Sequence, residues 1–234
     1  MKLNEAKCKY MIFSRSKEKF TTRLKINGEN LERISAIQLL GVWIAEDLSW
    51  DKNCRDICKR AYSRLSLITK LKYVGVCVDD LLDIYKLFIR SITEYCSVLF
   101  HSSLTQQQSN KLEAIQKTCL KVIYGETYTD YETALQMSGL QTLSERRLTR
   151  CLDFSLKCLN HEKMSKKFPK NPNFCKDLRF SELFIVNFAN TTSYQKSAIP
   201  FCQRSLKITR RTITSERKHV FASNSKFQIE RVRK

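Results

Sequence analysis

The chain has 234 residues, which is enough for one or two domains with a hydrophobic core. Hydrophobic residues make up 42%, which argues against disorder, and five glycines and three prolines are too few for a sandwich or barrel built from tight turns. The net charge of +19 favours a polyanionic partner, because each neutralised phosphate releases counterions. The alternative is a cationic surface that has no such partner.

Residues 1 to about 45 show the patterns of strands and turns. Cys8–Phe13 is strand-like, and Asn27-Gly28 between apolar residues predicts a hairpin. Leu39–Ala45 predicts a third strand, which we expect to be covered on both faces because it is apolar on both sides of Gly41.

Helical spacing of apolar residues begins at Ser49 and continues to Leu71. Ser49 is the expected N-cap of this first helix, with Asp51 in its first turn. A second helix is predicted from near Asp79 to Tyr95.

The third predicted helix starts at Thr105, where Gln108 completes a capping box, and Gly125 ends it. A short helix over Tyr131–Met137, stopped by Gly139, and a longer one from Ser144 to Leu159 are also expected. These patterns predict a mainly α protein: a helical bundle with a small N-terminal antiparallel β hairpin.

After about Glu162 the apolar residues no longer follow a helical spacing, and the chain becomes more basic. Residues 161–234 contain 17 Lys and Arg against 5 Asp and Glu. We expect Leu183–Val186 to be able to pack back on the body, and the region from Arg204 onward to be a disordered basic tail. The predicted segments are therefore 1–46, 47–162 and 163–234.

The ten cysteines form no compact disulfide framework, and most lie on apolar faces as small hydrophobic residues. The start, Met1-Lys-Leu-Asn-Glu5, is too polar for a signal peptide, and no apolar run reaches the roughly 20 residues of a membrane span. We expect free thiols, no membrane partner and an intracellular location, in the cytoplasm or nucleus.

Two stretches, Gln38–Trp50 and Leu3–Phe13, carry a family resemblance. Together with later segments such as Glu94–Ser97 and Ser197–Arg204, they resemble the reverse transcriptases of non-LTR (LINE-like, jockey-type) retrotransposons over about residues 3–206. The resemblance implies the late palm, the thumb and the following helices of an RNA-directed DNA polymerase. From the resemblance, we expect the fingers, most of the palm and the catalytic aspartates to be absent from this chain. The intact family enzyme uses Mg²⁺, whereas we expect this chain to have no cofactor and no polymerase activity.

The resemblance also implies roles for particular residues. In Leu3-Asn-Glu-Ala-Lys7, Lys7 corresponds to a late-palm lysine that approaches the phosphates of the incoming nucleotide. The segment Leu40-Gly41-Val42-Trp43 corresponds to the primer grip, where a glycine allows close approach of the backbone. The alternatives are an ordinary surface lysine and an ordinary buried strand.

The predicted first helix carries Lys52, Arg55 and Lys59 on or near the side opposite its apolar face, with Lys70 further along. In the family this is the thumb helix, which follows a template–primer duplex, and cations at helical spacing can track a phosphate backbone. A solvated helix face is the competing interpretation.

Two other patterns predict no chemistry. Asp79-Asp80 resembles a polymerase aspartate pair, but we expect it in the first turn of a helix, where carboxylates favour the dipole. Cys151, Cys158, His161 and Cys175 lack the short Cys-x-x-Cys spacing of a zinc site.

The sequence therefore predicts a truncated reverse transcriptase without catalytic residues or metal. Its remaining capacity is binding of RNA or RNA–DNA duplex without sequence preference. A degenerate reading frame without activity and a helical protein-interaction module are the alternatives.

Overall fold

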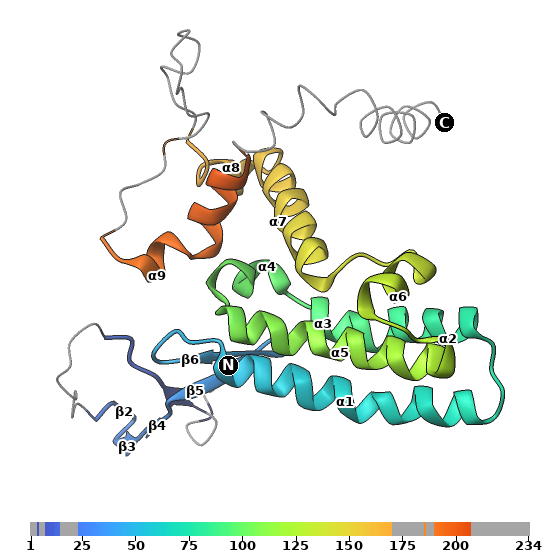
Figure 1. Cartoon of the computed structure of the whole chain (residues 1–234). Coiled ribbons are helices and arrows are strands. Elements are labelled where there is room, and N and C mark those ends of the chain that lie inside the picture. Colours follow the sequence, from blue (N-terminus) through green and yellow to red (C-terminus); the bar gives the residue numbers. More distant parts are fainter. Residues whose placement is uncertain (1–3, 5–7, 15–22, 170–184, 186–189, 207–234) are drawn as a thin grey trace, which may run out of the picture. The chain divides into compact units, whose positions relative to one another are not determined.

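The computed structural model describes residues 4, 8–14, 23–169, 185 and 190–206 (Figure 1). The protein is mainly helical with short strand pairs near its N-terminus, which confirms the predicted fold class. It divides into two compact units, the first made of Met1–Cys96 and Leu104–Ser144, the second of Ser97–Ser103 and Glu145–Lys234. The boundaries of these units differ from those of the predicted segments 1–46, 47–162 and 163–234, and the segments stay a prediction.

The first strands of the first unit are only two residues long. β1 (Lys9–Tyr10) pairs in parallel with β4 (Glu32–Arg33), so the predicted strand over Cys8–Phe13 is shorter than expected. β2 (Lys25–Ile26) and β3 (Glu29–Asn30) form the predicted antiparallel hairpin. Its turn residues Asn27 and Gly28 have φ values of 50° and 91°, as a two-residue type I′ turn requires.

The predicted strand Leu39–Ala45 is wrong, because the chain reverses within it. β5 (Ala36–Leu39) and β6 (Val42–Ala45) are antiparallel, with Leu39 opposite Val42. Leu40 and Gly41 form the connection, with φ values of 47° and 84°. Leucine is an unusual residue in this left-handed region, so the apolar sequence gives no signal of a turn here. The expected cover on both faces is also wrong, since most of β5 is exposed.

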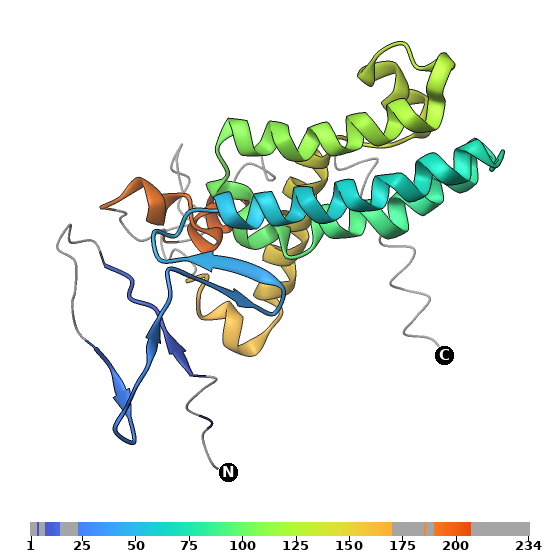
Figure 2. The same cartoon turned by 90° about the horizontal axis from the view of Figure 1, so that it is seen from below.

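Two long helices, α1 (Asp51–Tyr73) and α5 (Gln106–Tyr124), form the centre of this unit (Figures 1 and 2). At their beginnings, Gln108 Nε2 donates to Asp51 Oδ1 at 2.7 Å. At their ends, Lys72 Nζ donates to the Val122 and Ile123 carbonyls at 2.7 and 2.8 Å, so the helices run parallel. Buried apolar residues face inward from both helices: Cys54, Ile57, Ala61 and Ile68 on α1, and Leu112, Ile115, Cys119, Leu120 and Ile123 on α5.

The helix caps agree with the sequence patterns except at α1. Thr105 and Gln108 form the predicted capping box of α5, and Gly125 follows its last residue. At α1 the N-cap is Trp50, whose side chain makes no capping hydrogen bond, and not Ser49 as predicted. The Ser49 N–H instead donates to Asp47 Oδ1, which places Ser49 in the preceding turn.

The predicted second helix contains a π-helical segment. It consists of α2 (Val78–Ile84), the π-helix η2 (Tyr85–Arg90) and α3 (Ser91–Glu94). Asp79 and Asp80 lie in the first turn of α2, as predicted. Two carbonyls of η2 bond side chains: the Leu87 carbonyl accepts from Ser91 Oγ, and the Phe88 carbonyl accepts from Arg64 Nη1. A π-helix has a wider turn than an α-helix, and these side chains bond to backbone groups within it.

A short 3₁₀ turn, η4 (Gly125–Thr127), leads to α6 (Tyr131–Ser138). Asp130 caps α6 through the Thr133 N–H, and Gly139 ends it with a φ of 63°, as predicted.

The second unit has its own core. It contains α4 (Ser97–Phe100), η3 (His101–Ser103), α7 (Leu143–Leu159) from Glu145 on, α8 (Glu162–Ser165), α9 (Thr192–Gln195) and a helical stretch at 198–206. Cys151, Cys158, Phe168, Cys202 and Leu206 pack together and are buried. The helical, buried residues Ser205 and Leu206 thus lie where the sequence predicts disorder, whereas 207–234 lie outside the described residues. Of Leu183–Val186 only Ile185 is described, and it is exposed.

Among the described residues, no helix is long and apolar enough to cross a bilayer.

Candidate nucleic-acid interface

The predicted cations of α1 lie on one face of the helix. At about 100° per residue, Lys52, Arg55 and Lys59 fall within a narrow arc. This arc is opposite the buried residues Ile57 and Ala61, which pack inward. Arg55 and Lys59 are exposed, Lys52 is half-buried, and the exposed Lys70 continues the same row. We call Lys52, Arg55 and Lys59 the basic face.

The basic face keeps its charge available for a partner. None of the ion pairs found among the described residues includes Lys52, Arg55 or Lys59. On the same helix, Arg60 instead pairs with Asp56 at 2.8 Å. Exposed cations without a bonded carboxylate can exchange water and counterions for phosphates.

One cation of this face contacts the segment that the sequence assigns to the primer grip. Lys52 Nζ lies 3.7 Å from the centre of the Trp43 ring, a cation–π contact. The Trp43 N–H donates to Oδ1 of the buried Asn53 at 3.1 Å. Two contacts therefore hold β6 against the first turn of α1 and bring Trp43 and Lys52 together.

The other residues of the predicted primer grip, Leu40, Gly41 and Val42, differ in exposure. Leu40 is 84% exposed at the tip of the β5–β6 hairpin, whereas Val42 is 4% exposed. Tyr95 O–H donates to the Leu40 carbonyl at 2.9 Å, and a Cβ on Gly41 would lie 3.5 Å from the Tyr95 ring. The glycine thus serves a tight turn beside an aromatic ring, and an unusually exposed leucine precedes it.

A depression of about 340 Å³ lies beside the basic face, between the N-terminal halves of α1 and α5. Its lining contains two cations, two thiols, a carboxylate and an amide: Arg55, Lys111, Cys54, Cys58, Asp51 and Gln108. Burial raises the pKa of the Cys58 thiol, and the nearby charge of Lys111 opposes this shift. The sequence did not point to Lys111, because helical periodicity alone does not show which residues of two helices meet.

The remaining predicted positions are not joined to this site. Lys7 lies outside the described residues, so its role stays a prediction. Asp80 Oδ2 accepts a hydrogen bond from the Cys77 thiol at 3.1 Å. Within the described ranges no three His, Cys, Asp or Glu residues are grouped so that they could hold a metal. Cys175, the fourth member of the conjectured zinc set, also falls outside those ranges.

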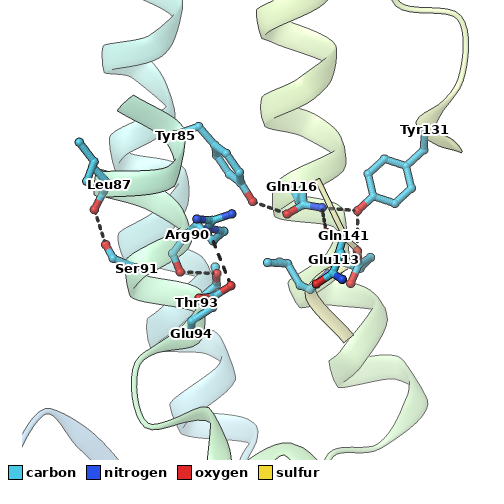
Figure 3. Close-up of polar contacts among 11 residues, drawn as sticks. Tyr85, Leu87, Arg90, Ser91, Thr93, Glu94, Glu113, Gln116, Tyr131 and Gln141 are labelled. Atoms are coloured by element: carbon cyan, nitrogen blue, oxygen red, sulfur yellow. Dashed lines mark hydrogen bonds and ion pairs between the residues drawn. The ribbon is translucent and has the colours of Figure 1, made fainter. Parts of the chain in front are cut away.

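Sequence reasoning missed a buried polar network in the first unit (Figure 3). Gln116 Oε1 accepts from Tyr85 O–H at 2.6 Å, and Gln116 Nε2 donates to Tyr131 Oη and the Gln141 carbonyl, both at 2.9 Å. Tyr131 O–H in turn donates to Glu113 Oε1 at 2.5 Å. The signal in the sequence was weak, because Tyr85 and Gln116 sit among the apolar positions of their helices.

Glu113 extends this network to the start of α7. Its two carboxylate oxygens accept from the N–H groups of Leu143 and Ser144 at 3.0 and 3.2 Å, so a side chain of α5 caps α7. Burial raises the pKa of Tyr85 and of Tyr131, and for Tyr131 the bond to Glu113 adds to the shift. The two tyrosines therefore stay neutral hydrogen-bonding groups, and the network joins η2, α5, α6 and the start of α7.

The described residues define a mainly helical protein with a cationic helix face, a half-buried Trp–Lys contact and a small charged depression. Comparison with protein-family models, with characterised proteins and with solved structures finds no match.

Proposed function

We propose that this chain binds RNA–DNA or other nucleic-acid duplex without sequence preference, through a region that resembles the late palm and thumb of a non-LTR retrotransposon reverse transcriptase. The observation that carries the proposal is the basic face of α1. The exposed Arg55 and Lys59 and the half-buried Lys52 lie on one side of the helix, opposite its buried side, and none of the ion pairs found among the described residues includes them.

The dimensions of this face suit a phosphate backbone. Lys52 and Lys59 are separated by about 10 Å along the helix axis, at 1.5 Å per residue. One nucleic-acid strand rises by about 3.4 Å per nucleotide along the duplex axis, so a helix that lies along this axis spans about three phosphates with this face. Lysine and arginine contacts to phosphates position a protein on the duplex but read no base edge, which is why the binding is non-specific.

The chain by itself carries out no polymerisation under this proposal. Two-metal phosphoryl transfer requires carboxylates that bridge ions roughly 4 Å apart. Asp79 and Asp80 instead begin a helix. With a primed RNA template, Mg²⁺ and nucleotides, we expect no primer extension by the purified chain. Extension that is abolished by Asp79→Asn would refute this assignment.

The test of the proposal is the salt dependence of duplex binding. In the variant Lys52→Gln/Arg55→Gln/Lys59→Gln, each lost phosphate contact should flatten the plot of log affinity against log salt by roughly 0.9. A matched control removes three exposed lysines elsewhere: Lys117, Lys121 and Lys157. The control should lower affinity only through the smaller net charge and keep most of the slope.

Three outcomes distinguish the proposal from its alternatives. An unchanged slope in the basic-face variant would refute the role of α1. Loss of the slope on deletion of 207–234, which contains nine Lys and Arg and two acidic residues, would place binding in that segment. This deletion leaves the buried Leu206 in place. Absence of any salt-dependent binding in the intact chain would favour a reading frame without activity or a protein-interaction module.

A further inference from the structure

The depression between α1 and α5 has charges of both signs, and their arrangement favours an anion. Arg55 from α1 and Lys111 from α5 lie on its two sides, and none of the ion pairs that the described residues form includes either. The only carboxylate of its lining, Asp51, accepts a hydrogen bond from Gln108 Nε2 at 2.7 Å. Two cations against one hydrogen-bonded carboxylate leave a net positive lining.

The helices reinforce this positive character. α1 and α5 run parallel, so their N-terminal ends lie together (Figure 2). Asp51 and Gln108, which belong to these ends, line the depression. Each helix has a partial positive charge of roughly +0.5 at its N-terminus, and parallel helices add their fields at the same end. The N-cap residue of α1, Trp50, makes no side-chain capping hydrogen bond, and Asp51 lies in the first turn of α1, whereas Thr105 and Gln108 cap α5.

We propose that Arg55 and Lys111 bind one phosphate group of a nucleic-acid backbone between α1 and α5. This inference rests on the proposed function and extends it, because it adds Lys111 of α5 to the residues of α1 that contact phosphates. The depression of about 340 Å³ lies at the lower end of ligand-site volumes, so it has room for a phosphate and part of its sugar. Arg55 supplies a planar fork that can bond two phosphate oxygens, and Lys111 supplies a point charge from the opposite side.

Cys58 provides a reporter inside the depression. Its thiol is half-buried and lines the same space as Arg55 and Lys111. A bound phosphate should block access of an alkylating reagent to this thiol. The rate of Cys58 alkylation, followed on its own peptide by mass spectrometry, should fall by a factor of about 1 + [L]/Kd. The probes are inorganic pyrophosphate and, separately, a short RNA–DNA duplex, each compared with sodium chloride at the same ionic strength.

The variants assign the effect to the two cations. Arg55→Gln and Lys111→Gln should each lose most of the protection, while Arg55→Lys and Lys111→Arg should retain part of it. Lys117→Gln, an exposed lysine on a different side of α5, is the matched control and should retain all of it. Because Lys111 also lowers the pKa of Cys58, rates are compared with and without the probe within each variant. Circular dichroism confirms that each variant is folded.

Each result has a definite meaning. No protection by pyrophosphate or duplex beyond that of chloride would overturn the inference, and so would protection that survives in both Gln variants. Protection by pyrophosphate but not by duplex would support the anion site and count against the proposed duplex-binding function. Protection by both, lost in Arg55→Gln and Lys111→Gln, would support the inference in full.

Discussion

Replacement of Gln116 by leucine should destabilise the first unit without affecting the surface that faces a ligand. The Gln116 side chain is 0% exposed and bonds Tyr85, Tyr131 and the Gln141 carbonyl (Figure 3). Leucine has a similar volume but accepts and donates nothing. The Tyr85 hydroxyl, on a side chain that is also 0% exposed, would lose its acceptor.

The magnitude follows from the groups that are left unpaired. A buried hydroxyl without a partner costs about 1–3 kcal/mol, and a typical hydrogen bond contributes about 1 kcal/mol net. Tyr131 retains its bond to Glu113, and the backbone carbonyl of the exposed residue Gln141 can bond water. We therefore expect Gln116→Leu to lower the free energy of unfolding by about 2–4 kcal/mol.

A double-mutant cycle with Tyr85→Phe tests the origin of this cost. Tyr85→Phe alone leaves Gln116 Oε1 without its donor, at a cost of about 1–2 kcal/mol. In the double variant neither partner is left unpaired, so the total should be smaller than the sum by about 1–2 kcal/mol. Both tryptophans, Trp43 and Trp50, lie in the first unit, so their fluorescence during urea unfolding follows that unit.

The control for this cycle is Gln107→Leu, which changes an exposed glutamine of the same helix. We expect it to change the free energy of unfolding by no more than about 0.5 kcal/mol. Costs in the cycle that add to within about 0.5 kcal/mol, or a loss in Gln116→Leu no larger than that of the control, would refute the reasoning.

Other predictions concern the turn, the pH response and a helix end. Leu40→Asn should raise the free energy of unfolding by about 1 kcal/mol, because the exposed Leu40 has a φ of 47° that asparagine tolerates; a lower urea midpoint would contradict this. Burial, and then the charge of Arg147, lower the pKa of His101 to about 4 from 6.5. Between pH 6.5 and pH 4, His101 is protonated in the unfolded chain but not in the native state. The free energy of unfolding therefore has its full value above pH 6.5 and decreases as the pH falls from 6.5 to 4. His101→Gln should flatten that fall in thermal melts, by less than about 1.4 kcal/mol per pKa unit because the ring is partly exposed; an unchanged pH dependence would count against it. Gly125→Ala should cost about 1–3 kcal/mol, since the added Cβ meets Lys72 Nζ and Gly125 has a φ of 56°; in a Lys72→Met background the cost should shrink, and an equal cost would show that the contact with Lys72 is unimportant.

The elements that the sequence predicts well are those whose signals lie within a few residues. Thr105 and Gln108 cap α5 through bonds across three positions, and Gly139 ends α6 with a left-handed φ. Asn27-Gly28 specifies its turn by the conformations of two residues. Such short-range interactions depend on adjacent residue types, so they are readable in a linear chain.

The features of the candidate site depend on residues that only the tertiary structure brings together. Tyr95 supports the Leu40 turn across 55 positions, and Gln108 reaches Asp51 across 57. Helical periodicity shows that Arg55 lies on an exposed face, but it contains no information about which turn of another helix lies opposite. The pairing of Arg55 with Lys111 around one depression follows from the parallel packing of α1 and α5, which the contacts at both of their ends hold in register.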